Sequence, residues 1–151
     1  MKLSKNFSLA EIEHSNTAKR LGIKNEMSEE HLANMQNLID NLIQPLRDGI
    51  GPIRISSGYR SPQLNKAIGG STRSQHSKAE ALDLQFWEKG KINNKVIYDW
   101  ILDSGLEFDQ MINEFDYSWI HISLKKNSNR GEVLEAYKNE KGKTKYRSVE
   151  S

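Results

Sequence analysis

The spacing of apolar residues changes at Gly51-Pro52, and this change constrains the fold more than any other feature of the sequence. Residues 28–48 carry apolar side chains every three or four positions, which predicts one long amphipathic helix with Ser28 as its cap. Beyond Pro52 the period becomes two, because Ile53 and Ile55 alternate with polar residues. A chain with both periods in separate stretches is expected to form an α+β domain.

Other segments of the sequence predict further helices and strands of this α+β domain. Ser8 and Glu11 stand in capping-box register and predict a short helix from Ser8, and the segment from Pro62 to two glycines predicts another. The remaining predictions are strands at 81–86, 108–115 and 119–124 and a helix over 96–102. We therefore expect a single domain in which helices pack against a mostly antiparallel sheet.

Length and composition exclude several classes of protein. A chain of 151 residues can bury one core, and the absence of cysteine excludes cysteine peptidases and Cys-ligated zinc. No apolar run is long enough for a membrane span, and the N-terminus lacks the apolar stretch of a signal peptide. We expect a monomer that stays in the cytoplasm of the producing cell.

Positive charge is concentrated at the C-terminal end. Residues 125–151 hold 8 of the 22 Lys and Arg residues but only 4 of the 20 Asp and Glu residues. This basic extension is a candidate contact for an anionic partner, and a solvated tail is the alternative. Residues 133–137 and 144–148 could pair as a terminal hairpin. Few aromatic side chains accompany the positive charges, so we expect no specific binding of nucleic acid.

Three polar residues stand out as a possible site, namely His76, Asp83 and His121. Asp83 and His121 occupy the polar faces of two alternating segments, where both could face a groove. Two imidazoles and a carboxylate suit a catalytic zinc ion that keeps a position for water. The alternative is that each is an ordinary, partly buried strand residue. His14 and His31 fall in the helical N-terminal third and are interpreted as structural or surface residues.

Several motifs, taken in order, carry a resemblance to a known family. They are Phe7-Ser-Leu-Ala-Glu11, Leu46-Arg47, Ile55-Ser-Ser-Gly-Tyr-Arg-Ser-Pro-Gln-Leu-Asn65, Ile68-Gly-Gly-Ser71, Ser74-Gln-His76, Ala81-Leu-Asp-Leu84, Asp109-Gln-Met-Ile-Asn-Glu114 and Trp119-Ile-His-Ile-Ser-Leu124. Over about residues 5 to 124, the chain resembles the zinc D-alanyl-D-alanine carboxypeptidase and L-alanyl-D-glutamate endopeptidase family of peptidoglycan peptidases, which includes many phage endolysins. The resemblance implies a fold similar to that of hedgehog and D-Ala-D-Ala peptidases.

The resemblance also implies site residues. It makes His76, Asp83 and His121 the ligands of one catalytic zinc ion. The chain departs from the family pattern at Ala79, where the family has glycine. An alanine fits without strain only where φ is negative, so we expect an extended backbone at Ala79 and an intact metal site.

Hydrolysis further needs a proton carrier and a group for the developing negative charge. Glu114 is the predicted general base, and Asp116 is the alternative, because other relatives carry an acid at the position that is Ser118 here. The resemblance assigns Arg60 to the oxyanion or a substrate carboxylate, for which a surface ion pair is the alternative. It assigns Ser74 to substrate binding, for which a loop-stabilising hydroxyl is the alternative.

These observations predict a zinc metallopeptidase domain over residues 1–124, with residues 125–151 as a basic extension of the same domain. The expected substrate is an amide bond in the peptide stem of bacterial peptidoglycan, and the expected role is that of a phage-type endolysin, which reaches the wall after the membrane is opened. A cytosolic host enzyme would have the same features. The rival is a non-catalytic, zinc-containing wall-binding module of the same fold, whose only support is Ala79.

Overall fold

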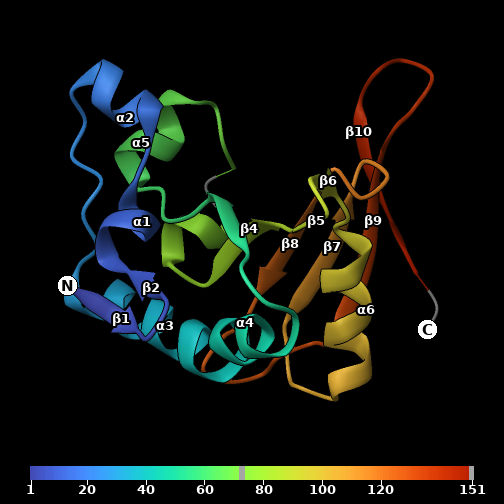
Figure 1. Cartoon of the computed structure of the whole chain (residues 1–151). Coiled ribbons are helices and arrows are strands. Elements are labelled where there is room, and N and C mark those ends of the chain that lie inside the picture. The colour runs from blue at the N-terminus through green and yellow to red at the C-terminus, as the bar shows by residue number, and fades with distance from the viewer. Residues whose placement is uncertain (72–73, 150–151) are drawn as a thin grey trace.

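A six-stranded mixed sheet forms the centre of the computed structural model, which describes residues 1–71 and 74–149 (Figure 1). The elements in chain order are β1 (Lys2–Ser4), β2 (Phe7–Ser8), α1 (Leu9–Glu13), α2 (Asn16–Leu21), α3 (Glu29–Leu38), η1 (Ile39–Ile43), α4 (Gln44–Ile50), β3 (Arg54–Ser57), α5 (Pro62–Ala67), η2 (Gln75–Lys78), β4 (Ala81–Gln85), β5 (Trp87–Glu88), β6 (Lys91–Ile92), α6 (Lys95–Ser104), β7 (Gln110–Glu114), β8 (Trp119–Ser123), β9 (Glu132–Lys138) and β10 (Thr144–Ser148).

The strand order in the large sheet is β10-β9-β7-β8-β4-β3. Every neighbouring pair is antiparallel except β7 and β9, which are parallel. The predicted α+β domain with a mostly antiparallel sheet is confirmed. The sequence period of two sets its two faces, because alternate side chains of β4, β7 and β8 enter the core. These core residues are Leu82, Leu84, Met111, Ile120 and Ile122.

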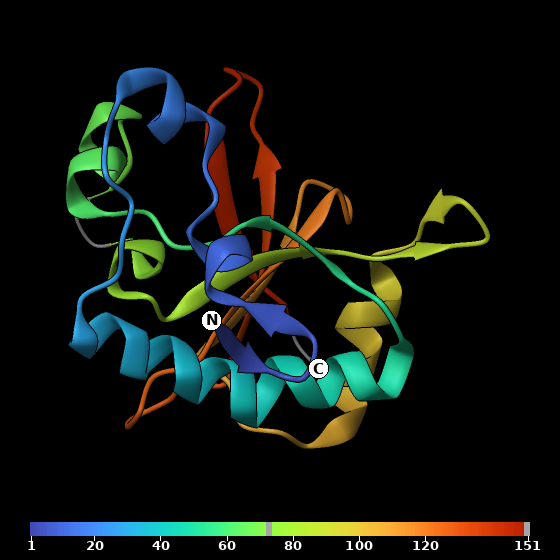
Figure 2. The same cartoon turned by 60° about the vertical axis from the view of Figure 1, so that its left-hand side comes forward.

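The predicted long helix is confirmed as a continuous run of α3, η1 and α4 beneath the sheet (Figure 2). It starts after Ser28, whose hydroxyl accepts a hydrogen bond from the His31 amide at 3.2 Å. Its apolar stripe is fully buried and consists of Met35, Leu38, Ile39, Leu42, Ile43 and Leu46. Helix α6 packs beside α4, where a Cβ on Gly49 would lie 2.4 Å from the Trp100 indole nitrogen. This close approach requires glycine.

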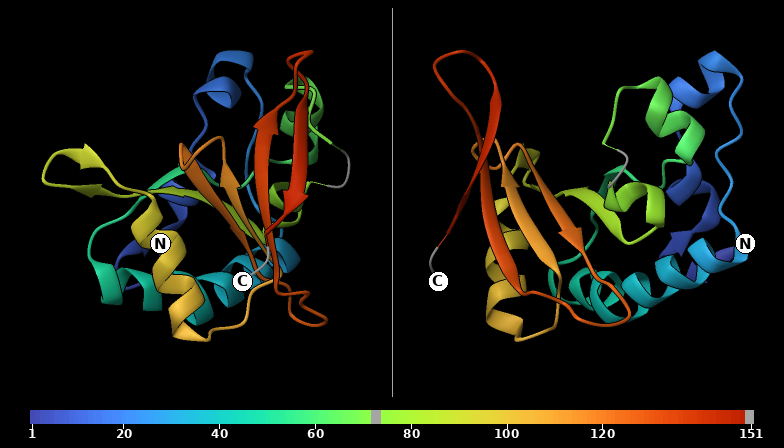
Figure 3. Two further views of the ribbon diagram at one scale, coloured as in Figure 1. Left: turned by 90° about the vertical axis from the view of Figure 1, so that its right-hand side faces the viewer. Right: turned by 180° about the vertical axis from the view of Figure 1, so that it is seen from behind.

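The C-terminal extension continues the sheet instead of forming a solvated tail. Strand β9 pairs with β7, and β10 pairs with β9 at the sheet edge (Figure 3). The register aligns Thr144 with Lys138 and Ser148 with Leu134. Strand β9 therefore adjoins β7, the strand that ends at Glu114, and β10 lies one strand further away.

Several short elements, including η2, were not predicted. Strands β1 and β2 form a two-stranded sheet near the N-terminus, and β5 and β6 form a hairpin that projects from the body of the molecule (Figures 2 and 3). Strands of two or three residues are too short to reveal a period of two. Helix α2, capped by Ser15, spans only six residues and has no repeated apolar stripe. Within the described residues, no helix has the length and apolar character needed to cross a membrane.

Candidate metal centre and active-site groove

Asp83 and His121 meet because β4 and β8 pair in one particular register. The two residues are directly opposite each other across the antiparallel pair, so their side chains leave the sheet on the same face. Asp83 Oδ1 lies 3.1 Å from His121 Nδ1. The sequence predicts the polar face of each strand but not this alignment.

His76 reaches the same carboxylate from η2. The Ser74 hydroxyl caps this turn by accepting a hydrogen bond from the His76 amide at 3.3 Å. His76 Nδ1 lies 2.8 Å from the Gly58 carbonyl oxygen. A carbonyl oxygen can only accept, so Nδ1 carries the proton and Nε2 presents a lone pair. Nε2 is buried, has no hydrogen bond within residues 1–71 and 74–149, and lies 3.3 Å from Asp83 Oδ1.

Gly58 makes this position of His76 possible. A Cβ on Gly58 would lie 2.3 Å from the Ile12 carbonyl oxygen of α1, so no other residue fits there without moving the helix. The close packing brings the Gly58 carbonyl to His76 Nδ1 and so orients the imidazole. The requirement for glycine is a packing constraint and does not arise from its φ angle.

His121 is oriented by a chain of hydrogen bonds from the other side. His121 Nε2 lies 3.2 Å from Gln75 Oε1, and Gln75 Nε2 donates to Asp109 Oδ2 at 2.8 Å. Since the carboxylate can only accept, the amide oxygen of Gln75 must face His121. His121 Nε2 is therefore the protonated nitrogen, and Nδ1 presents its lone pair to Asp83.

Asp109 anchors this chain and is fully buried. Arg130 donates to it from Nε at 3.0 Å, from Nη2 at 2.8 Å and from its backbone amide at 3.0 Å. Burial alone would raise the pKa of Asp109, but the hydrogen bonds from Arg130 lower it to about 2. Asp109 therefore remains an acceptor at neutral pH. The sequence analysis missed Gln75, Asp109 and Arg130, although the first two lie inside quoted motifs.

The three side chains fit a zinc ion. Two imidazole lone pairs face one carboxylate oxygen at 3.1 and 3.3 Å, an arrangement that is unfavourable unless a cation lies among them. Ligand atoms held at 2.0–2.1 Å by a tetrahedral ion lie about 3.3 Å from one another. One ligand atom from each of His76, Asp83 and His121 lies within 4.8 Å of the others.

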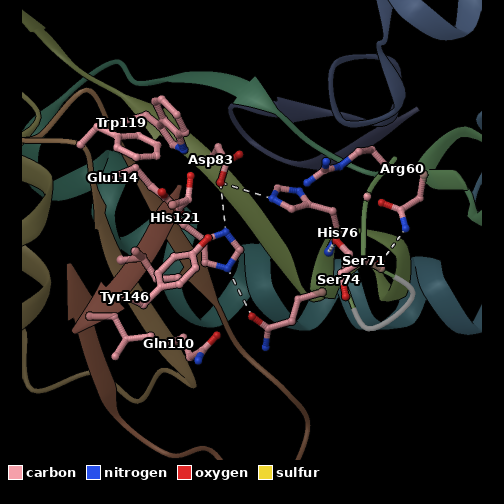
Figure 4. Close-up of a pocket in the computed structure, with 17 residues that line it drawn as sticks. Arg60, Ser71, Ser74, His76, Asp83, Gln110, Glu114, Trp119, His121 and Tyr146 are labelled. Atoms are coloured by element: carbon pink, nitrogen blue, oxygen red, sulfur yellow. Dashed lines mark hydrogen bonds and ion pairs between the residues drawn. The ribbon is translucent and has the colours of Figure 1, made fainter. Parts of the chain in front are cut away.

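The group lies in an open groove of about 620 Å³ (Figure 4). Glu114, at the end of β7, lines this groove and is only 8% exposed. Burial and the negative charge of Asp83 raise the pKa of Glu114 to about 7, although His121 acts in the opposite direction. Asp116, the alternative base, is exposed in the turn between β7 and β8 and does not line the groove.

Arg60 lines the same groove, and its Nε is buried with no hydrogen bond to any residue that the structure describes. Burial lowers the pKa of the guanidinium, and the charge of Asp83 partly opposes this effect. The loop that carries Arg60 is held by Asn25, whose side chain donates to the Tyr59 carbonyl at 2.8 Å and accepts from the Ser61 amide at 2.7 Å. A guanidinium group held in place at the groove is suited to bind an oxygen anion.

Comparison with known families agrees with the geometry. A family model described as Peptidase M15 matches residues 5–123. The chain belongs to the peptidase M15 family. This membership indicates a hydrolase that acts on peptide bonds. No protein in the curated set matches the chain.

Ala79 corrects one expectation for this M15 peptidase. Its φ is 58° and its ψ is 36°, so the backbone is left-handed and not extended. A left-handed alanine costs about 1–2 kcal/mol, which is the reason for glycine at this position of the family pattern. The Ala79 methyl group is fully buried in the core, and its burial offsets about 0.8 kcal/mol of that cost. The metal ligands still converge, so Ala79 gives the non-catalytic reading no structural support.

Ser74 has a structural contact in this M15 peptidase as well as a place in the groove. Its hydroxyl caps η2, as the loop-stabilising alternative requires, and its side chain also lines the pocket. His14 and His31 lie outside the metal group, as expected. His31 Nδ1 lies 3.0 Å from the Tyr59 hydroxyl, and His14 is exposed.

The chain from Asp109 to His121 leads to a prediction about metal affinity. Gln75→Ala removes the acceptor that keeps the proton on His121 Nε2, so we expect the affinity for zinc to fall by about 10- to 100-fold. Competition with a chromophoric chelator measures this change. Gln85→Ala is the matched control. Gln85 lies on the face of β4 that carries Asp83, but its side chain donates to the Ser118 carbonyl and not to the metal group. Equal affinities of both variants would contradict the predicted role of Gln75.

The raised pKa of Glu114 leads to a prediction about stability in the metal-free protein. Its pKa is about 7 in the folded state and 4.5 ordinarily, so folding favours the protonated form. The resulting stabilisation is complete below pH 4.5 and is lost as the pH rises through 7, which amounts to at most about 3 kcal/mol. Urea unfolding should show wild type losing stability relative to Glu114→Gln between pH 5 and 8. A constant difference would contradict the prediction.

Proposed function

We propose that this M15 peptidase binds one zinc ion at His76, Asp83 and His121 and hydrolyses an amide bond in the peptide stem of bacterial peptidoglycan. The observation that carries the proposal is the convergence of two imidazole lone pairs on one carboxylate oxygen, at 3.1 and 3.3 Å, in an open groove. The sequence motifs shared with peptidoglycan peptidases support the choice of substrate. A phage-type endolysin is the biological role that we propose for it.

Each groove residue has a distinct task in this proposal. A zinc ion supplies Lewis acidity and lowers the pKa of a water molecule to about 7. Glu114 takes a proton from the attacking water and delivers it to the nitrogen of the leaving amine, a task that suits a carboxylate that lines the groove beside the metal ligands. Arg60 binds the oxyanion or a substrate carboxylate through its guanidinium group at the groove. Ser74 holds His76 in place and can also contact the substrate.

The decisive experiment identifies the bond that is cut. The zinc-loaded protein is incubated with purified peptidoglycan and with a soluble stem pentapeptide, and the products are identified by mass spectrometry. We expect new amino groups, loss of activity with a chelator, and recovery when zinc is added back. Zinc binding without hydrolysis of any wall type would overturn the proposal in favour of a wall-binding module.

The basic extension supports a second contact with the wall. Lys141 and Lys143 are exposed in the turn between β9 and β10. We propose that this turn binds anionic wall polymers, an interaction that salt should weaken. Because β9 is paired with β7, removing residues 125–151 would expose the edge of β7. Lys141→Ala with Lys143→Ala is therefore the better test.

The double lysine variant should show reduced sedimentation with whole cell walls at low salt but unchanged cleavage of the soluble pentapeptide. Both turn residues lie outside the groove lining. A reduction in pentapeptide cleavage would indicate a folding defect and not a lost charge contact. Unchanged sedimentation at low salt would contradict the proposed wall contact.

A further inference from the structure

We propose that the hairpin of β9 and β10 forms one wall of the substrate groove, and that Tyr146 binds a peptide carbonyl of the substrate through its hydroxyl group. This inference rests on the proposed function and names a binding residue outside the part of the chain that the family model matches, which ends at residue 123.

The strand register puts Tyr146 on the active-site face. Glu114 of β7 is aligned with Ala136 of β9, and Ala136 is aligned with Tyr146 of β10. Residues directly opposite one another across neighbouring strands point to the same side of a sheet. Tyr146 therefore lies on the face that carries Glu114 and His121, two strands away from Glu114, which corresponds to about 10 Å.

The residue aligned between Glu114 and Tyr146 leaves room for a ligand. Ala136 carries only a methyl group and is 1% exposed, so the residue aligned between Glu114 and Tyr146 does not separate them. Ile112 and Leu134 continue this floor beside the metal group. A groove surface of short aliphatic side chains suits a peptide with small side chains, such as the alanine residues of a wall stem.

Tyr146 itself is unusually available for a strand residue. The residue is 55% exposed and lines the groove, and its side chain points toward His121 and Glu114 in Figure 4. Its hydroxyl has no hydrogen bond to any residue in the described ranges. Partial burial and the charges of Glu114 and Asp83 raise the pKa of the phenol, so it remains a hydrogen-bond donor at neutral pH.

The position of Tyr146 relative to Arg60 indicates which part of the substrate it binds. Figure 4 shows the two side chains on opposite sides of the His76, Asp83 and His121 group. With Arg60 binding an anion on one side of the scissile bond, Tyr146 is positioned to donate to a backbone carbonyl on the other side. The groove thus favours a peptide that extends past the scissile bond in both directions.

The test compares three variants with a soluble stem pentapeptide, for which contact with wall polymers is irrelevant. Tyr146→Phe removes only the hydroxyl group, and we expect KM to rise about fivefold with little change in kcat. Tyr146→Ala also removes the ring, and we expect kcat/KM to fall by about 30-fold or more. Tyr137→Phe is the matched control, because Tyr137 is on the opposite face of the same hairpin and stacks on Arg147. It should match wild type.

A titration that does not depend on turnover completes the test. Binding of the pentapeptide to zinc-loaded Glu114→Gln and to Glu114→Gln with Tyr146→Phe should differ by the same fivefold factor in Kd. If wild type is active and the kcat/KM of both Tyr146 variants lies within twofold of the wild-type value, the role of Tyr146 is overturned and the proposed function stands. An inactive wild type would overturn the proposed function, and the titration would still decide whether Tyr146 binds the peptide; equal or undetectable binding would overturn that role too.

Discussion

Glu114→Gln is expected to lower kcat for stem-peptide hydrolysis by about 10²- to 10⁴-fold while zinc content stays unchanged. Glutamine has nearly the shape of glutamate but cannot accept and return a proton. The glutamate side chain is almost buried in the groove that Asp83 and His121 also line, where it can exchange a proton with a water molecule at the metal group. The measurement is the initial rate of amine release at pH 7, together with metal analysis of the same sample.

Asp116→Asn is the matched control for this substitution. It makes the same chemical change two residues further along, in the exposed turn where Asp116 has a φ of 55°. We expect a rate within twofold of wild type, because Asp116 does not line the groove. A large loss in Asp116→Asn with an active Glu114→Gln would transfer the role of base to Asp116.

His121→Ala is expected to abolish both zinc retention and hydrolysis. The substitution removes one of three ligand atoms, and it leaves Asp83 facing only His76. Two remaining ligands cannot hold a zinc ion against dialysis as three do. Metal content by atomic absorption and peptide cleavage should fall together, to below a tenth of the wild-type zinc and to background rates.

The control for metal loss is His14→Ala, since His14 is an exposed histidine outside the metal group. It should retain about one zinc per chain. Circular dichroism separates loss of metal from loss of fold, because the core beneath β4 and β8 does not include His121. Full zinc content in His121→Ala would contradict the proposed ligand set.

Local sequence determined the elements whose stabilisation is local. The long helix was predictable because its apolar stripe spans many turns, and its start was predictable because Ser28 caps it. The capping box of Ser8 and Glu11 forms as expected, with both reciprocal hydrogen bonds. The alternation in β4 and β8 also separated the core face from the face that carries Asp83 and His121.

Tertiary structure decided how these faces meet. The register that aligns Asp83 with His121 depends on packing across the whole sheet, so neither strand specifies it alone. The proton positions on His76 and His121 depend on the Gly58 carbonyl and on Gln75, which come from other parts of the chain. The φ of Ala79 likewise depends on the turn that carries His76 to the site.

The C-terminal hairpin gives the clearest contrast between what the local sequence predicts and what tertiary structure decides. Residues 133–137 and 144–148, on either side of Asn139-Glu-Lys-Gly142, suggested a terminal hairpin, because a short turn is specified locally. Nothing in it indicated that β9 would pair in parallel with β7, since that partner lies more than 20 residues upstream. This pairing aligns Tyr146 with Glu114 through Ala136 and brings Arg130 to Asp109. Sequence alone determined the longer strands and the chemical groups, whereas long-range pairing decided which groups share a groove.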